Sequence, residues 1–366
     1  MGILSGVKVV EFTHMVAGPA CGMILGDFGA RVIKVEPPQG DITRRIGPRV
    51  NGTGALYAST NRNKEIVTLD LNDATEADDA VELAMSADVV VTNLDVALLK
   101  RAHLDATTLR ERNPALIVVT ITGFGPGGPA GTDGLAQAAM GMMEATGPVE
   151  GPGYRTGPSI VDVSTGTWAA LGVLAALENR RQTGMGDEIR SSLADACLYL
   201  QYPHVTMHDA SPATVRRNGN HSVVSCTPMF QASDGRFMAT ILHDRHWQIF
   251  CTAIGAPELF EDAMFDSNEK RCELQNELEA RVDPMTRKRT RTEWVERLRA
   301  ERLPCAPERS YAEVESDRTL YEREMLYRLP ENGGSLQVAM PLEFSTLKIS
   351  APRPPAHPSR PLRAGQ

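Results

Sequence analysis

Short apolar runs alternate with helical segments from the amino terminus to about residue 210, and this alternation limits the fold more than any other feature. The strand-like runs are rich in β-branched and aliphatic residues: Val7–Val10, Arg31–Val35, Ile66–Leu71, Asp88–Val91, Leu116–Ile121 and Gly186–Ser191. The helical segments are Ala74–Met85, Gly134–Gly147, Ser164–Thr183 and Leu193–His208. Strands joined through helices lie parallel, and a parallel sheet is covered on both faces. The pattern therefore predicts an α/β fold built on a parallel sheet.

The chain changes character near Asn218–Asn220, and we place the first domain boundary there. Residues 1–220 are predicted to form a large domain and residues 221–328 a smaller one, with a strand at Phe237–Leu242 and several charged amphipathic helices. Residues 329–349 are expected to return to the large domain, with a strand-like pattern over Pro341–Ile349. Residues 350–366 contain five prolines and are predicted to be an extended tail.

Charge and cysteine usage exclude several classes of protein. Lys plus Arg total 38 against 46 for Asp plus Glu, a net charge of −8, whereas nucleic-acid-binding proteins more often carry a basic stripe. The six cysteines form no Cys-x-x-Cys pair, which is typical of free thiols in a reducing cytoplasm. We find no apolar run near the ~20 residues of a membrane helix, and no basic start or cleavage site of a signal peptide. We expect a cytoplasmic protein without a membrane or nucleic acid partner.

Two motifs that suggest a cofactor are better explained without one. Gly123–Gly128 has the G-x-G-x-x-G spacing after a strand, but its prolines and further glycines prevent the helix that a dinucleotide site needs. A sharp loop is predicted there instead. His204 and His208 are four residues apart on a predicted helix, yet Val205 stands where a zinc protease carries Glu. Two histidines on a packing face are the simpler interpretation, so we predict no metal site.

Asp162 lies where an apolar segment turns into the long helix that ends at Thr183, before Gly184. An acidic residue at a helix start is often a cap that accepts hydrogen bonds from backbone N–H groups. The position alone therefore favours a capping role.

The wider pattern resembles the class III CoA-transferase family, which includes formyl-CoA transferase and the carnitine CoA-transferases. The matching segments keep their order and spacing: Leu4–His14, Ala17–Pro19, Gly26–Glu36, Gly40–Arg44, Asn61–Lys64, Thr68–Leu71, Ala87–Asp88, Asn113–Pro114, Thr122–Gly125, Gln137–Ala138, Asp162–Gly166, Thr183–Gly184 and Ser233–Gly235. The similarity covers most of the chain and is strongest up to about residue 200. It implies a Rossmann-like large domain with a smaller inserted α+β domain, and two chains interlocked in a homodimer.

The resemblance also implies a chemistry. The aspartate matching Asp162 is the family's nucleophile, which accepts the acyl group of a donor acyl-CoA, then carries CoA as an aspartyl thioester and passes it to a small carboxylic acid. CoA is a substrate in this chemistry, and no tightly bound cofactor is implied. The same resemblance assigns Asp133 and Gln137 to substrate binding, and assigns CoA binding to His14, Val16, Ala17, Arg44, Lys64, Leu69, Asn93 and Arg101. Arg44, Lys64 and Arg101 are the cations expected to hold phosphates.

Two alternatives to a transferase stay open. The α-methylacyl-CoA racemases share the scaffold and resemble a Gly-His-Asp motif where this chain has Gly131-Thr-Asp133. Without that histidine one of two opposed acid-base groups is missing, although Asp133 supplies the other. The second alternative is a noncatalytic CoA-binding subunit, which the presence of Asp162 disfavours. After Asn93 the family's Phe-x-Pro-Gly is replaced by Leu94–Ala97, so the CoA-facing turn is expected to differ.

Overall fold

The computed structural model describes residues 2–50, 52–222, 224–329, 334–347, 349 and 352–355. The chain forms two compact units: unit 1 comprises residues 1–142, 156–202 and 318–366, and unit 2 comprises residues 143–155 and 203–317. These limits differ from the predicted boundaries after residues 220 and 328, and residues 143–155 belong to unit 2 although they precede both. Most of the predicted tail, residues 350, 351 and 356–366, lies outside the described residues.

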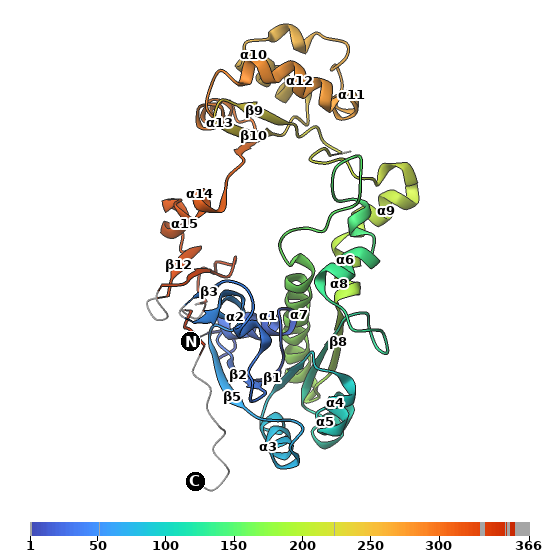
Figure 1. The fold of residues 1–366 in the computed structure, drawn as a ribbon, viewed down its shortest axis with the longest axis vertical. Helices are drawn as coiled ribbons and strands as arrows, with labels where there is room; N and C mark the ends of the chain where they lie inside the picture. Colours follow the sequence, from blue (N-terminus) through green and yellow to red (C-terminus); the bar gives the residue numbers. More distant parts are fainter. Residues whose placement is uncertain are drawn as a thin grey trace. The chain divides into compact units, whose positions relative to one another are not determined.

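A six-stranded parallel sheet forms the centre of unit 1 (Figure 1). Its strands are β1 (Lys8–Phe12), β2 (Arg31–Glu36), β5 (Lys64–Thr68), β6 (Val89–Thr92), β7 (Ile117–Thr122) and β8 (Glu188–Ser192). Their order in space is β5-β2-β1-β6-β7-β8, and every neighbouring pair is parallel. The predicted α/β fold is confirmed, and each strand predicted within residues 1–210 is present with its ends shifted by a few residues.

Helices cover both faces of this sheet. Helices α1 (Ala17–Asp27) and α7 (Ile160–Thr183) pack on one face, and α3 (Ala74–Met85), α4 (Val96–Arg101) and α5 (Ala106–Arg112) pack on the other. Successive residues of a strand point to opposite faces, so Val89 and Val91 meet the first group of helices while Val90 meets the second. Burial on both sides is the reason that the two inner strands β6 and β7 consist of β-branched residues without a charge.

The remaining elements of unit 1 are short. They are α2 (Ala55–Thr60), α6 (Asp133–Ala139), α8 (Leu193–Leu200), α15 (Arg318–Glu322), a turn of 3-10 helix at Ile42–Arg44, and the antiparallel pairs β3 (Arg49–Val50) with β4 (Thr53–Gly54) and β12 (Leu326–Arg328) with β13 (Leu336–Val338). The helix predicted over Gly134–Gly147 is therefore much shorter, with a separate 3-10 turn at Met142–Glu144. The strand predicted over Pro341–Ile349 is wrong, because its described residues form no strand.

The expectation that no apolar run approaches the length of a membrane helix is wrong for α7. By length and composition this helix could cross a membrane, with a mean hydropathy of 1.6 over 18 residues. It is in part a core helix, since Val161, Ala169 and Val173 are buried against the sheet and α1, and 39% of that window is buried. The helix ends at Gly184, which adopts a left-handed φ of 75° as a C-cap, as predicted.

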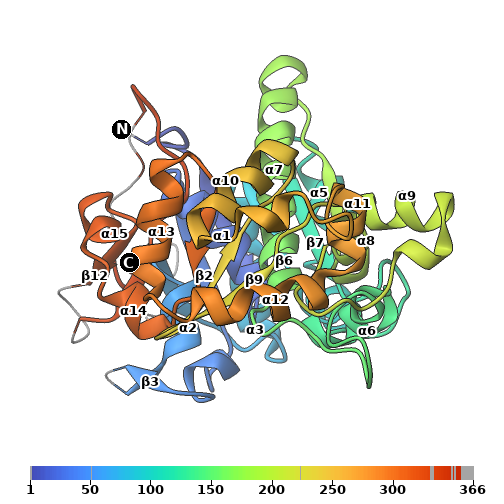
Figure 2. The ribbon, with the colours of Figure 1, turned by 90° about the horizontal axis from the view of Figure 1, so that it is seen from above.

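Unit 2 has its own hydrophobic core around a three-stranded antiparallel sheet of β9 (Met229–Ala232), β10 (Gly235–Ala239) and β11 (Cys305–Pro307). Its helices are α9 (Tyr202–Ala210), which begins at the end of unit 1, α10 (Asp244–Ile254), α11 (Asn268–Glu273), α12 (Gln275–Thr286), α13 (Arg291–Ala300) and α14 (Tyr311–Glu315), with 3-10 turns at Pro212–Thr214 and Pro257–Phe260. Helix α12 lies beside β9 (Figure 2), and its Glu279 and Asp283 accept hydrogen bonds from the backbone of that strand.

Candidate active site

The strand order of unit 1 reverses between β1 and β6. From β1 the chain proceeds outward through β2 to β5, and then returns to β6 and continues in the other direction through β7 to β8. In open parallel sheets, ligands bind in the crevice beyond the carboxyl ends of the two strands that flank such a switch point. The candidate site therefore lies beyond Phe12 at the end of β1 and Thr92 at the end of β6.

Asn93 links these two strand ends. Its side-chain amide donates to the carbonyl oxygen of His14 at 2.9 Å, and its Oδ1 accepts from the backbone N–H of His14, also at 2.9 Å. Met15, the next residue, has a φ of 63°, which a side chain with a Cβ rarely adopts. Strained backbone of this kind persists where the surroundings hold it, often at functional sites. Nothing in the sequence marks Met15, because methionine has no preference for this conformation.

The start of α1 follows this turn. Val16 is the N-cap of α1, and no side chain caps the helix there. The first N–H groups of a helix and its dipole attract anions. The buried Val16 and Ala17 thus offer backbone rather than side chains to a ligand.

Asp162 lies at the same edge of the sheet. Helix α1 follows β1 and helix α7 precedes β8, so both run antiparallel to the strands and both begin at the carboxyl edge. Gly166 brings the two starts together, because a Cβ there would meet the Ala17 carbonyl oxygen at 2.7 Å and the Ala20 Cβ at 2.8 Å. Asp162 is one helical turn before Gly166 on the same side of α7. Its carboxylate therefore lies near the start of α1.

Asp162 is not the N-cap of α7. The helix begins at Ile160 with Ser159 as the N-cap residue, and Asp162 is in the first turn. The hydrogen bonds of a cap are supplied by Asp133 at the start of α6, whose Oδ2 accepts from the backbone N–H groups of Val161 at 2.8 Å and Asp162 at 3.1 Å. Among the described residues, no side chain hydrogen-bonds the Asp162 carboxylate, so it is available for chemistry.

Gln137 holds the Asp133 carboxylate in place by a hydrogen bond. Its Nε2 donates to Asp133 Oδ1 at 2.5 Å and to Thr156 Oγ1 at 3.1 Å, while its Oε1 accepts from the Thr156 N–H at 2.9 Å. Both side chains are buried and their polar atoms bond within unit 1. Asp133 and Gln137 therefore do not fit the predicted role of direct substrate ligands, and they hold the start of α7 instead. An Asp133 committed to these bonds is also a poor general base, which weakens the racemase alternative.

The environment of Asp162 disfavours its charged form. Burial raises the pKa of the carboxyl group to about 6, and the nearby negative charge of Asp133 adds to the rise. A carboxylate with a raised pKa is more basic than one in water, and perturbed groups of this kind are common at active sites. At neutral pH the group is still mostly ionised and able to act as a nucleophile.

The basic residues predicted to hold phosphates differ in accessibility. Arg101 is exposed at the end of α4, and no side-chain bond to another described residue is found for it. Arg44 is partly exposed but pairs with Glu36 at 2.7 Å and lies over the ring of Tyr57. Of these cations Arg101 is the one best placed to meet a ligand from solvent.

Lys64 does not fit the predicted role of phosphate ligand. Its side chain is fully buried, and its ammonium donates to Glu11 Oε1 at 2.8 Å, the Pro19 carbonyl at 2.8 Å and Asn61 Oδ1 at 3.1 Å. Burial lowers the pKa of Lys64 to about 8, and the Glu11 carboxylate opposes that shift. An ammonium has three donors, so none is left for a phosphate. Leu69, predicted on the adenine side, is likewise a buried core residue.

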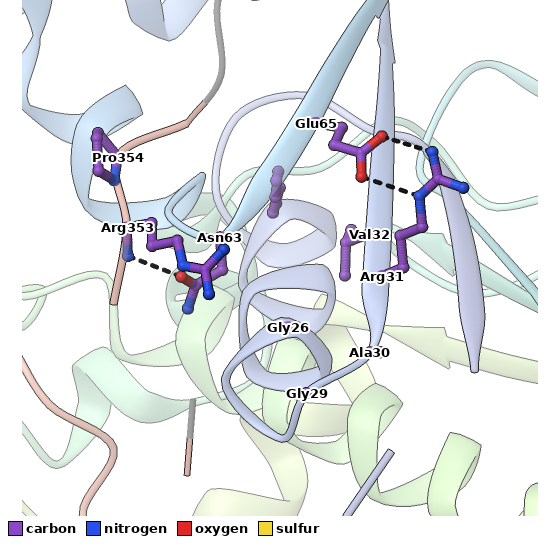
Figure 3. A pocket seen from close by; sticks show the side chains of 10 residues that line it. Gly26, Gly29, Ala30, Arg31, Val32, Asn63, Glu65, Arg353 and Pro354 are labelled. Carbon is purple, nitrogen blue, oxygen red and sulfur yellow. Dashed lines mark hydrogen bonds and ion pairs between the residues drawn. The ribbon is translucent and has the colours of Figure 1, made fainter. Parts of the chain in front are cut away.

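A pocket on unit 1 lies at the other edge of the sheet (Figure 3). It is formed at the amino ends of β2 and β5 by Arg31, Asn63 and Glu65 together with Arg353 and Pro354. The backbone of Arg353 pairs with Asn63, donating to its Oδ1 at 2.7 Å and accepting from its N–H at 2.9 Å. Because this edge is opposite to the switch point, we do not assign the pocket to the candidate active site.

Comparisons with known proteins identify the family of this chain. Residues 4–359 match the model of CoA-transferase family III. The succinyl-CoA:mesaconate CoA-transferase of Haloarcula hispanica is 31% identical over 93% of this chain and 89% of that protein, and the acetyl-CoA:oxalate CoA-transferase of Acetobacter aceti is 32% identical over 97% of this chain and 92% of that protein. A crystal structure of a CAIB/BAIF family protein from Brucella suis matches with a TM-score of 0.88 and 31% identity, covering 97% of this chain and 96% of the other.

Proposed function

Because the chain belongs to CoA-transferase family III and is an enzyme of that type, we propose that it transfers CoA from an acyl-CoA to a carboxylic acid through a covalent intermediate on Asp162. The observation that carries this proposal is that Asp133, and not Asp162, accepts the backbone hydrogen bonds at the start of α7. Asp133 accepts the backbone N–H groups at the start of α7, which leaves the Asp162 carboxylate without a hydrogen-bond partner among the described residues.

The proposed reaction begins with attack by an Asp162 carboxylate oxygen on the thioester carbonyl carbon of the donor. The C–S bond breaks, CoA leaves as a thiolate, and a mixed anhydride remains on Asp162. The thiolate then attacks the aspartyl carbonyl carbon, which releases the donor's carboxylate and forms an Asp162–CoA thioester. The acceptor carboxylate reverses these two steps and leaves as the new acyl-CoA. Each step exchanges one activated acyl bond for another, so no external energy source is needed.

The protein's contribution is to position these groups. Gln137 and Asp133 fix the start of α7 and therefore the direction of the Asp162 carboxylate. The uncapped start of α1 is placed to stabilise negative charge on CoA, and Arg101 adds a cation at the end of α4. The Asn93 amide shapes the turn between these elements rather than offering itself to CoA, since both of its polar atoms bond to the His14 backbone.

We also propose that the enzyme is a cytoplasmic homodimer. The outward side of α7 and α8 in unit 1 carries apolar side chains that a monomer would leave in water. They are Trp168, Leu171, Leu198 and Tyr199, which are 40 to 54% exposed. Contiguous exposed apolar surface of this kind usually marks an interface. Sedimentation equilibrium should give the mass of a dimer, and a monomer at micromolar concentration would contradict the proposal.

A substrate panel tests the function. The protein is incubated with succinyl-CoA or acetyl-CoA and with mesaconate or oxalate, the compounds named for its relatives, and new CoA esters are identified by mass. Asp162→Asn should keep the fold but lower turnover by at least about a thousandfold, because an amide cannot form the anhydride. Asp195→Asn is the matched control, since Asp195 is the acidic residue in the first turn of α8 and should retain near wild-type turnover. Full activity of Asp162→Asn would refute the assignment.

A further inference from the structure

Two lysines are buried completely beneath the first turn of α1. Lys34, in the middle of β2, and Lys64, at the start of β5, have no exposed side-chain surface. Removing an ammonium from water costs several kcal/mol even after the protein relaxes. Lysines are therefore rarely buried without partners that use all their donors. The role of Lys34 and Lys64 can therefore be inferred from the groups that their ammonium groups bond.

Lys64 reaches the beginning of α1. Its ammonium donates to the carbonyl oxygen of Pro19 at 2.8 Å, in addition to its bonds with Glu11 and Asn61. Pro19 is the third residue of α1, within the turn of helix that begins at Ala17. The bond therefore ties the first turn of α1 to the start of β5, on the far side of β2.

Lys34 reaches the end of β1. Its ammonium donates to the carbonyl oxygen of Thr13 at 2.9 Å and to Asp41 Oδ2 at 2.9 Å. Thr13 follows the last residue of β1, and its hydroxyl donates to Glu11 Oε1 at 3.0 Å. Glu11 thus connects the two lysines, at 2.8 Å from Lys64 and 3.7 Å from Lys34.

The two bonded carbonyls mark the ends of the turn at the switch point. Between Thr13 and Pro19 lie the exposed His14 and the strained, exposed Met15, followed by the buried start of α1. Glu11 and Asp41 supply two negative charges against the two positive charges of the lysines, so the cluster is neutral and the turn itself gains no net charge from it. A buried ionic cluster is weak evidence for stability, but it can select one backbone geometry over others.

We propose that Lys34 and Lys64 are positioning residues, which hold residues 13–19 in the conformation that binds CoA, and this inference rests on the proposed function. They act through the backbone carbonyls of Thr13 and Pro19 and do not touch the substrate. They fix the turn at its two ends, and the Asn93 amide adds two bonds to the backbone of His14, the residue after Thr13. The role replaces the one expected from sequence, in which Lys64 binds phosphate directly.

The chain offers a matched control in Arg62. This residue is also a buried cation and lies two positions before Lys64, but it pairs with Asp27 at the last position of α1, at 2.6 Å. Within the described part of the chain, its side chain hydrogen-bonds Asp27 and reaches no atom of residues 13–19. Arg62→Met therefore removes a buried cation from the same segment of the chain, but one that binds the end of α1 away from the turn.

The experiment measures CoA binding by calorimetry and backbone hydrogen exchange on the full chain. Lys64→Met and Lys34→Met should raise the Kd for CoA at least about tenfold and speed amide exchange in residues 14–18. In Lys64→Met, kcat at saturating acyl-CoA should fall much less than the affinity. Arg62→Met should leave the Kd near the wild-type value and speed exchange near Asp27 instead.

The outcomes separate the two proposals. Equal changes of Kd in Lys64→Met and Arg62→Met, or unchanged exchange at residues 14–18 in both lysine variants, would overturn the positioning role. If wild-type protein binds no CoA, the proposed function fails, while the exchange data still decide whether the lysines hold the turn. Should Lys64→Met not fold, Lys34→Met provides the same test from the other end of the turn.

Discussion

The ion pairs at the switch point of unit 1 differ in burial from the ion pairs on the surface of unit 2. Around the switch point of unit 1, Glu11, Lys34, Asp41 and Lys64 have no exposed side-chain surface, and their bonds extend to backbone carbonyls. In unit 2 the pairs between Arg236 and Glu308 and between Lys270 and Asp266 are each close to half exposed. Buried charges of the first kind dictate where the backbone lies, whereas exposed pairs of the second kind are competed for by water and salt.

One residue of unit 2 departs from this pattern. The Arg271 side chain is almost fully buried, yet it pairs with an Asp244 that is 72% exposed, and it donates to the Phe265 carbonyl at 2.8 Å. All these partners belong to unit 2, and the guanidinium lies 5.8 Å from the centre of the Trp247 ring. Burial of a cation alone therefore does not indicate a functional turn. The role of the lysines of unit 1 is inferred from the carbonyls that they bond, those of Thr13 and Pro19.

The largest effect on stability is expected where a buried pair loses one member. Arg62→Met leaves the carboxylate of Asp27, whose side chain is 3% exposed, with the Asn63 amide as its one remaining side-chain partner among the described residues. We expect the free energy of unfolding to fall by about 3 to 5 kcal/mol. Urea unfolding at pH 7.5 measures it, and the double variant Asp27→Leu/Arg62→Met should recover part of the loss. A fall below about 1 kcal/mol would show that buried and exposed pairs do not differ here.

An intermediate effect is expected at Asp162, a partly buried charge for which the described residues provide no hydrogen-bond or ion-pair partner. Its pKa is raised from 3.8 to about 6, so between these values the native state keeps a proton that the unfolded state has lost, and stability falls as pH rises. Asp162→Asn removes this cost. Above pH 7 the free energy of unfolding of this variant should be about 2 kcal/mol higher than that of the wild type. Below pH ~3.5 the two free energies of unfolding should be equal. Urea unfolding at several pH values tests this, and a gain independent of pH would contradict it.

The smallest effect is expected at the exposed pair of unit 2. Arg236→Ala breaks the two hydrogen bonds to Glu308, at 2.7 and 2.8 Å, but both side chains lie in water. The free energy of unfolding should change by less than about 1 kcal/mol and the change should shrink further in ~0.5 M salt. A loss as large as that of Arg62→Met would remove the distinction between the units.

The fold could be predicted well because it depends on local pattern. The bounds of α3 are those predicted, Ala74–Met85, since Asp73 caps its start and its apolar residues recur at helical spacing. The break at Gln201 between α8 and α9 was missed, although Pro203 near the start of α9 is a signal for a new helix.

The site could be predicted only in part, because it depends on contacts between distant residues. The motif predicts Asp162 as the nucleophile. The backbone N–H groups beside it are bonded by Asp133, 29 positions away, and no local pattern reports that bond. Lys64 was misjudged for the same reason. Its partner Glu11 is 53 positions away, and a lysine at a strand start gives no sign of being buried.

The most direct test of the covalent mechanism is a mass measurement on the protein itself. Wild-type protein mixed with a competent acyl-CoA, before an acceptor is added, should carry a CoA-sized adduct on the peptide that contains Asp162, and hydroxylamine should convert the adduct to a hydroxamate at that residue. Asp162→Asn should carry none. An adduct on another residue would contradict the account. So would the absence of any adduct on wild-type protein while the carbon-2 hydrogen of the acyl group exchanges with solvent.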